Sequence, residues 1–305
     1  LTVGLILSVL AIRTARKAVT EKVETHLIDK ATDTAEIIDG RITAFWQFLE
    51  GIARMPVLID TNISYAEKMA YLKVEAAFNE QIFELNIVDM KGNRHTADGT
   101  VFNVSDRNWF QAAAQGKDFF SEPLQSRIYA GKLIAVFAVP IYNEQRQVVN
   151  VLAANVDGLW LSDQIKDIVV GKTGSVYIVG TSGTTIADPD PDTVTSMWNS
   201  TKAAESDNRL KPLAEIEQKA LNSQQAIFGT YYYKGVVKIS AGKAMNNGWA
   251  VIVFAPINEF MGTVQTLRVS MYIIGVIILL VALIITFIVA SRIVKPIKVT
   301  VDALQ

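Results

Sequence analysis

The chain has 305 residues, of which 50% are hydrophobic, and this is enough for about two domains with buried cores. Its formal net charge of −1 argues against a nucleic-acid partner, because binding to phosphates requires clusters of lysine and arginine. The sequence contains no cysteine and only 2 histidines, which excludes disulfides and thiolate metal sites and leaves little scope for histidine chemistry.

The first segment, LTVGLILSVLAI (residues 1–12), carries no charge and is followed by Arg13, Arg16 and Lys17. It is too short to span a bilayer as a helix. We expect it to be the end of a first transmembrane helix, in a fragment of a longer protein, because the chain lacks an initiating methionine. A cleaved signal peptide is the alternative, but a cleavage pattern of small residues is missing from the sequence.

Residues 13–56 predict one long helix, because no proline occurs before Pro56 and the apolar residues recur in steps of three and four. This apolar seam consists of Ile28, Ala31, Ala35, Ile38, Ile42, Phe45, Leu49 and Ile52. A helix of some 40 residues is about 60 Å long, which exceeds a single small domain. We therefore expect a stalk helix whose seam packs partly on its own domain and partly on a second copy of the chain.

Residues 57–168 predict a first module. A helical stretch over 65–80 precedes two hairpins whose strands are rich in valine, alanine and isoleucine. The hairpins turn at DMKGN (residues 89–93) and at NEQRQ (residues 143–147). A second helical stretch, residues 158–169, leads out of the module.

Residues 169–266 repeat this scheme. A strand, a turn at TSGT and a second strand precede the acidic segment DPDPD (residues 188–192). Residues 209–223 are expected to be helical, a hairpin turns at YKG (residues 233–235), and GWAVIVFAPINEF (residues 248–260) contains a last strand. Two successive antiparallel sheets predict an α+β fold. DPDPD lacks the glycine and the late glutamate of a calcium loop, so we expect a solvated loop and no metal.

The segment VSMYIIGVIILLVALIITFIVA (residues 269–290) contains no charge and predicts a transmembrane helix about 33 Å long. Arg292, Lys295 and Lys298 follow it, so the positive-inside rule places the C-terminus in the cytoplasm and the region of about 255 residues before it outside. The basic residues after position 12 oppose this orientation, although such residues do occur outside the cytoplasm.

Several segments together resemble a double Cache sensor domain, the extracytoplasmic part of bacterial chemoreceptors. They are IVDMKGNRH, DRNWFQAAAQGKDFFSEP, GKTGSVYIVGTSGTTIADPD and NGWAVIVFAPINEF, in this order within residues 13–268. SRIVKPIKVTVDALQ (residues 291–305) resembles the start of a HAMP signal-transfer helix, with Pro296 at its usual place. The resemblance implies two tandem PAS-like modules on a stalk helix, flanked by transmembrane helices, with ligand binding in the membrane-distal module and no catalysis.

The same resemblance implies a ligand site. Members that bind amino acids use an Arg-x-Trp-(Tyr/Phe) stretch, which Arg107, Trp109 and Phe110 fit. A guanidinium offers paired donors to a carboxylate, and an indole N–H adds another donor. Phe102 stands where the family often has a tyrosine in the ligand pocket. It would keep the aromatic wall of the pocket but lacks the tyrosine's hydroxyl group. Asp106 is expected to cap the helix that begins at position 107 or 108.

The family holds the ligand's ammonium group with two acidic positions, and here both are changed. The first falls in PLQS, which places Leu124 and Ser126 there, and the second falls on Asn155, or on Asp157 if the register slips by two. A buried ammonium group without a carboxylate partner is costly. The resemblance therefore implies a carboxylate without an amine, or a neutral polar metabolite, in preference to a free amino acid.

The implied function is the sensing region of a methyl-accepting chemotaxis protein in the bacterial inner membrane. It would act as a homodimer that signals through the second transmembrane helix to a cytoplasmic domain and its kinase and adaptor partners. The sensor of a histidine kinase or of a diguanylate cyclase is the alternative, and a surface spacer or adhesion module is a third. No nucleophile elbow and no glycine-rich phosphate loop occurs in the sequence, so we expect neither enzymatic activity nor a cofactor.

Overall fold

The computed structural model describes residues 2–129, 131–289 and 292. By their internal contacts these residues fall into two units, which we describe separately. One joins the start of the chain, up to His26, to the chain from Pro256 onward, and the other is Leu27–Ala255. The predicted start of a HAMP helix falls on residues 291–305 and, apart from position 292, lies outside the described residues.

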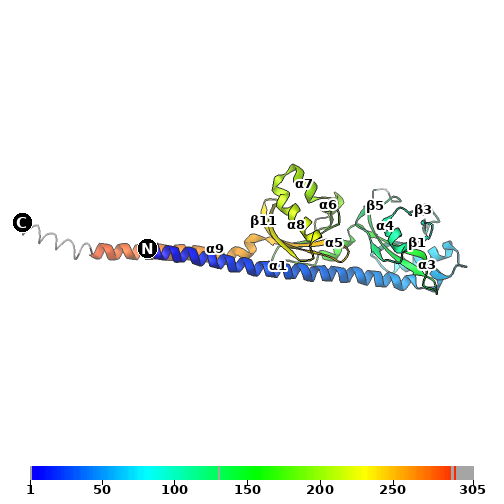
Figure 1. The fold of residues 1–305 in the computed structure, drawn as a ribbon, viewed down its shortest axis with the longest axis horizontal. Helices are drawn as coiled ribbons and strands as arrows, with labels where there is room; N and C mark the ends of the chain where they lie inside the picture. The colour runs from blue at the N-terminus through cyan, green and yellow to red at the C-terminus, as the bar shows by residue number, and fades with distance from the viewer. Residues whose placement is uncertain (1, 130, 290–291, 293–305) are drawn as a thin grey trace, which may run out of the picture. The chain divides into compact units, whose positions relative to one another are not determined.

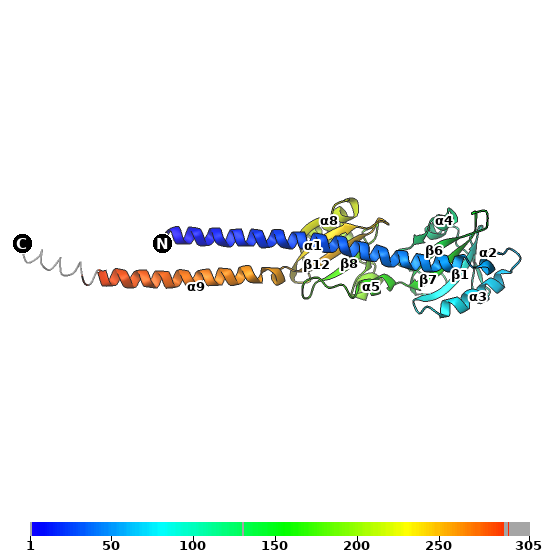
Figure 2. The same cartoon turned by 90° about the horizontal axis from the view of Figure 1, so that it is seen from below.

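In the first unit, the start of helix α1 (Thr2–Ala53) lies alongside helix α9 (Ile257–Val289) (Figure 2). Val9 and Arg13 of α1 line a common groove with Met261 and Arg268 of α9. Within the described residues, α9 is the one helix whose length and apolar composition suffice to cross a membrane. It contains nearly all of the predicted span, residues 269–290.

The seam of α1 is buried within this one chain. From Ala31 to Ile52 every predicted seam residue is buried, and at the start of the seam Leu27 is buried while Ile28 is only half-buried. The long helix is thus confirmed, and so is the expected packing of the seam on its own domain from Ala31 to Ile52. That a second copy contacts the stalk helix stays a prediction, and along Ala31–Ile52 such a contact would use another face of α1.

The first sheet has seven strands in the order β3-β2-β1-β7-β6-β4, with β5 paired to β6. The strands are β1 (Ile82–Asp89), β2 (Asn93–His95), β3 (Val101–Asn103), β4 (Phe119–Phe120), β5 (Leu124–Gln125), β6 (Leu133–Tyr142) and β7 (Val148–Asp157). The accompanying helices are α2 (Pro56–Ile59), α3 (Tyr65–Ala77), α4 (Asn108–Ala114) and α5 (Trp160–Ile165). Both predicted hairpins are confirmed as the antiparallel pairs β1·β2 and β6·β7. The short strands β3, β4 and β5 were not predicted.

Side chains alternate between the two faces of this sheet, as a strand requires. On β6, the ring of Phe137 faces α1, and its centroid lies 4.4 Å from that of Phe45. Its neighbours Val136 and Ala138 point to the opposite face and share a buried cluster with Trp109 of α4. The sheet therefore lies between α1 and α4 (Figure 1).

The second sheet has five strands in the order β10-β11-β12-β8-β9. The strands are β8 (Ser175–Val179), β9 (Thr185–Ala187), β10 (Ile227–Tyr233), β11 (Val236–Ala244) and β12 (Ala250–Pro256). Helices α6 (Pro191–Thr195), α7 (Ser200–Ser206) and α8 (Lys211–Asn222) and the short helix η1 (Asn208–Leu210) complete it. Leu213, Ile216 and Ala220 of α8 pack on Tyr177 and Tyr231 of the sheet, on the side away from α1 (Figure 1). The two antiparallel sheets and the long helix confirm the predicted α+β class.

An aromatic cluster joins α1 to both sheets. The rings of Phe120 and Phe137 are stacked at 3.8 Å, and Phe120 also lies 5.4 Å from Trp249, which precedes β12. Trp160 of α5 lies 5.4 Å from Phe45 of α1. Five large apolar side chains thus meet between the sheets, which favours a fixed arrangement within Leu27–Ala255.

Candidate functional site

A cavity of about 110 Å³ lies on the face of the first sheet that carries α4. It is lined by five of the eight predicted site residues, namely Phe102, Arg107, Trp109, Leu124 and Ser126. They come from β3, from the start of α4, and from β5 with the turn after it. Elements distant in sequence therefore bring the predicted side chains to one place, although whether these residues bind a ligand stays a prediction.

Arg107 owes its position to the beginning of α4. The helix starts at Asn108, and Arg107 is its N-cap residue, with extended backbone angles (φ −83°, ψ 132°) and no capping hydrogen bond from its side chain. The prediction that Asp106 caps this helix is wrong. Its carboxylate instead accepts two hydrogen bonds from Arg127, at 3.1 and 2.7 Å. The guanidinium of Arg107 is thus left for the cavity.

The Arg107 guanidinium is half-buried, and in the described part of the chain it makes neither a hydrogen bond nor an ion pair. Burial, and after it the charge of Arg127, lowers the pKa of Arg107, while Asp106 opposes this shift. Keeping the charge on Arg107 in this position therefore costs desolvation free energy. An anion bound in the cavity would offset that cost.

A buried ion pair adjoins the cavity through Arg94, which lines it. Arg94 Nη2 lies 2.9 Å from Glu84 Oε2, and their side chains are only 6% and 13% exposed. The same carboxylate oxygen accepts hydrogen bonds from the hydroxyl of Tyr129 at 3.0 Å and from Nδ2 of Asn155 at 3.3 Å. Asn155 is not among the residues that line the cavity, and its side-chain amide is bound to Glu84. Glu84 and Arg94 were not predicted as site residues, and Tyr129 could not be assigned from the sequence.

Two of the other predicted residues, Phe110 and Asp157, do not line the cavity, and Ser126 has a second role in the turn after β5. Phe110 is buried in the cluster between α4 and the sheet. Asp157 is exposed at the end of β7, where its carboxylate accepts a hydrogen bond from the backbone N–H of Leu159 at 2.8 Å. The hydroxyl of Ser126 accepts a hydrogen bond from the backbone N–H of Tyr129 at 2.9 Å, so it shapes the turn as well as lining the cavity.

The charges around the cavity favour an anion. Three guanidinium groups, on Arg94, Arg107 and Arg127, face two carboxylates, on Glu84 and Asp106, which leaves one surplus positive charge. Two of the three arginines are paired, so this surplus belongs to Arg107. A carboxylate ligand would complete the set with charge-assisted hydrogen bonds.

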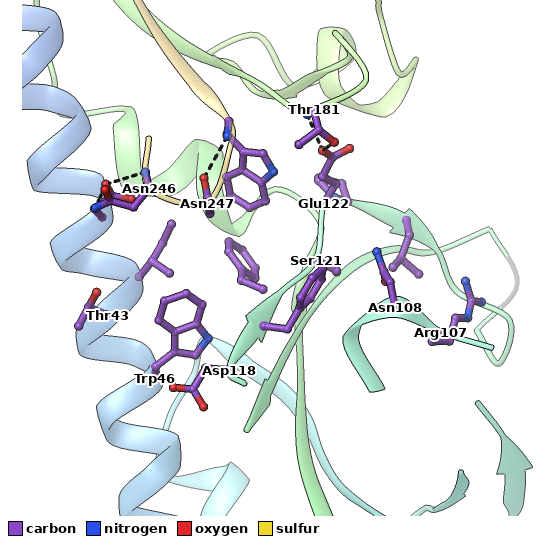
Figure 3. Close-up of a pocket in the computed structure, with 17 residues that line it drawn as sticks. Thr43, Trp46, Arg107, Asn108, Asp118, Ser121, Glu122, Thr181, Asn246 and Asn247 are labelled. Carbon is purple, nitrogen blue, oxygen red and sulfur yellow. Dashed lines mark hydrogen bonds between the residues drawn. The ribbon is translucent and has the colours of Figure 1, made fainter. Parts of the chain in front are cut away.

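A second cavity, of about 820 Å³, lies beside α1 and also reaches Arg107 (Figure 3). Trp46 and Trp249 give it aromatic walls, while Asp39 and Asp118 contribute carboxylates. Burial, and after it the charge of Glu50, raises the pKa of Asp118 to about 6. These acidic groups repel an anion, so the smaller cavity is the better candidate for a carboxylate site.

The Cache domain family model matches residues 11–264 of the chain. Among solved structures, the ligand-binding domain of the Pseudomonas fluorescens chemoreceptor CtaA with L-isoleucine superposes with a TM-score of 0.61, at 17% identity over 82% of this chain and 99% of that one. The ligand-binding domain of the Campylobacter jejuni chemoreceptor Tlp3 with L-valine superposes with a TM-score of 0.58, at 11% identity over 80% of this chain and 96% of that one. The extracellular domain of the histidine kinase mmHK1S-Z2 superposes with a TM-score of 0.58, at 14% identity over 78% of this chain and 99% of that one. At such identities the likeness shows a shared fold. No curated protein matches the chain significantly.

Proposed function

Because this chain belongs to the Cache domain family, we propose that it is the extracytoplasmic ligand-sensing region of a bacterial transmembrane chemoreceptor. The single observation that carries the proposal is the half-buried, unpaired guanidinium of Arg107 in the cavity beside Trp109. Residues 57–168 are then the membrane-distal, ligand-binding module, and residues 169–266 the membrane-proximal one. Helix α9 is the second transmembrane helix, followed by a HAMP segment and a cytoplasmic signalling domain. The region itself performs no catalysis.

The proposed ligand is a short monocarboxylate without an amine. A water molecule occupies about 30 Å³ in the liquid, so a cavity of about 110 Å³ has the volume of about four waters. That space suits a carboxylate with two or three carbons. An α-ammonium group would need an unpaired carboxylate, and Glu84 is already neutralised by Arg94. CtaA and Tlp3 were solved with amino acids, so this chain would differ from them in ligand class.

The exposed side of α1 supports a homodimer. Ile37 and Phe48 are 44% and 41% exposed, and Gly40 and Ala44 lie between them at helical spacing. An apolar stripe with small residues lets two helices approach closely, as in a stalk shared by two copies. Light scattering on the full chain in detergent should give the mass of a dimer, and Phe48→Glu should convert it to a monomer.

A histidine kinase is the second candidate for the whole protein, favoured by the likeness to the sensor domain of mmHK1S-Z2. Both assignments require the same ligand site and differ only in the output domain. The sequence of the coding region downstream of position 305 decides between them. A long heptad-rich hairpin indicates a chemoreceptor, whereas catalytic motifs indicate a kinase or a cyclase.

Calorimetry on the full chain in nanodiscs tests the ligand class. Acetate, propionate, pyruvate and L-lactate are titrated alongside glycine and L-alanine, which add the α-ammonium group at nearly the same size. The titrations are repeated on Arg107→Met, so that binding in this cavity is the part lost in the variant. For that part, we expect at least one of the four acids to bind at least about tenfold more tightly than its amino counterpart, because the ammonium group lacks a partner. Tighter binding of either amino acid that is lost in Arg107→Met would contradict the proposed class. No binding of any of the six would favour a spacer.

A further inference from the structure

The second sheet has a cavity of its own, of about 230 Å³, on the face that carries α8. Residues that pair directly across an antiparallel ladder share a face. Tyr231 pairs with Lys238, and Phe254 pairs with Ser175, so all four side chains point into this space. The register of these four strands therefore places one lysine against aromatic side chains.

In the described part of the chain, no carboxylate forms an ion pair with Lys238. Its ammonium group is half-buried and lies 3.9 Å from the ring centre of Phe254 and 5.2 Å from that of Tyr233. Burial lowers the pKa of Lys238. By contrast, Lys234 at the rim is paired with Asp190 at 3.4 Å.

Asp188 brings the opposite charge to the same cavity. Its side chain is half-buried, and burial raises its pKa. Its carboxylate accepts a hydrogen bond from the backbone N–H of Asp190 at 2.7 Å, but in the described residues it forms no ion pair. Asp188 and Lys238 shift each other's pKa through their charges, although they form no ion pair in the described residues. Both groups are therefore partly desolvated, while the ammonium group has unused hydrogen-bond donors and the carboxylate has unused acceptors.

We propose that this membrane-proximal cavity is a second ligand site that binds a small zwitterion, with its carboxylate on Lys238 and its ammonium group on Asp188. A ligand with one charge would leave the other half-buried charge without a partner, whereas a zwitterion satisfies both. The volume equals that of about eight waters, which suits a molecule of about eight non-hydrogen atoms. Trp198 and Tyr233, with ring centres 5.7 Å apart, supply apolar walls for its hydrocarbon part. The site is separate from Arg107 and does not depend on the function of the distal cavity.

Calorimetry on the full chain in nanodiscs tests the site with L-valine and L-proline as probes. Isovalerate and isobutylamine serve as matched analogues of L-valine that lack the amine and the carboxylate. We expect a zwitterion to bind, each analogue to bind at least about tenfold more weakly, and Lys238→Met and Asp188→Asn each to weaken the zwitterion by a similar factor. Arg107→Met should leave this binding unchanged.

Three outcomes would overturn the site. Loss of zwitterion binding in Arg107→Met alone would place the ligand in the distal cavity. An analogue that binds as tightly as L-valine, or no binding of either zwitterion at millimolar concentration, would likewise contradict the proposal. A second measurement needs no ligand. Because the Lys238 charge is desolvated and unpaired, Lys238→Met should raise the melting temperature of the free protein by about 2–4 °C. The exposed control Lys219→Met should leave it unchanged. A lower melting temperature for Lys238→Met would show that this lysine serves the fold and not a ligand.

Discussion

Glu217 should make the stability of the second sheet depend on pH. It lies on the buried face of α8, where its carboxylate accepts a hydrogen bond from the hydroxyl of Tyr177 at 2.8 Å and another from Ser200. Burial raises the pKa of Glu217 from 4.5 to about 7, although both hydrogen bonds oppose this shift. Glu217→Gln keeps the shape and both hydrogen-bond partners but removes the charge.

The sign follows from proton uptake. Between pH 4.5 and about 7 the folded state holds a proton on Glu217 that the unfolded state has lost, so the free energy of unfolding falls as the pH rises through this window. A shift of about 2.5 pKa units corresponds to about 3 kcal/mol, at 1.36 kcal/mol per unit. At pH 8 the wild-type protein therefore bears the full cost of burying the charge, and at pH 4.5 it bears little of it.

Differential scanning fluorimetry of the full chain in detergent, from pH 4.5 to pH 8, measures this effect. Glu217→Gln should match the wild-type protein at the acidic end and exceed it by roughly 6–10 °C at pH 8. Glu215→Gln, on the exposed side of the same helix, is the matched control and should follow the wild-type curve throughout. Parallel curves for Glu217→Gln and the wild-type protein would refute this account of the buried carboxylate.

Two further predictions concern the buried ion pair and the packing of glycines. Arg94→Met should lower the free energy of unfolding by about 3 kcal/mol or more, because it leaves Glu84 buried without its cation. Urea denaturation of Arg94→Met and of Glu84→Gln measures this loss, and a loss below about 1 kcal/mol for Arg94→Met would contradict the prediction. Gly174→Ala should destabilise the second sheet by about 2 kcal/mol, because a Cβ there would lie 2.3 Å from the carbonyl oxygen of Phe254. Gly51→Ala, also in α1 and with nothing within 4 Å, should instead stabilise by about 0.5–1 kcal/mol, and equal effects of the two substitutions would contradict the packing described.

The elements that could be predicted from the sequence are those with a local signal. The hairpins β6·β7 and β10·β11 have long apolar strands and tips of polar or glycine-containing residues, and both were predicted. Strands β4 and β5 have two residues each, too few to show any alternation. They exist because β6 offers an edge, which is a property of the assembled sheet.

The site shows the same division. Arg107 and Trp109 could be found because the family pattern lies in one short segment. The pair of Arg94 and Glu84 depends on how β1 registers with β2, and the hydrogen bond from Asn155 joins residues 71 positions apart. Asp106 precedes a helix and so suggests a cap, but the ion pair with Arg127 competes for its carboxylate. Such long-range choices leave no pattern in a single sequence.

The seam of α1 illustrates what periodicity predicts and what it leaves open. Steps of three and four residues establish that one face of the helix is buried. They do not say whether the covering surface belongs to the same chain or to another. Here the rings of Phe137 and Trp160 cover Phe45, so the chain buries its own seam.

The central claim is that Arg107 holds a carboxylate in the distal cavity. The most direct test is calorimetric titration of the tightest-binding short monocarboxylate into the full chain in nanodiscs, for the wild-type protein, Arg107→Met and Arg209→Met. Arg209 is exposed and paired with Asp207, so its loss is the matched control. We predict at least about tenfold weaker binding for Arg107→Met and unchanged binding for Arg209→Met. Equal affinity of the wild-type protein and Arg107→Met would contradict the claim.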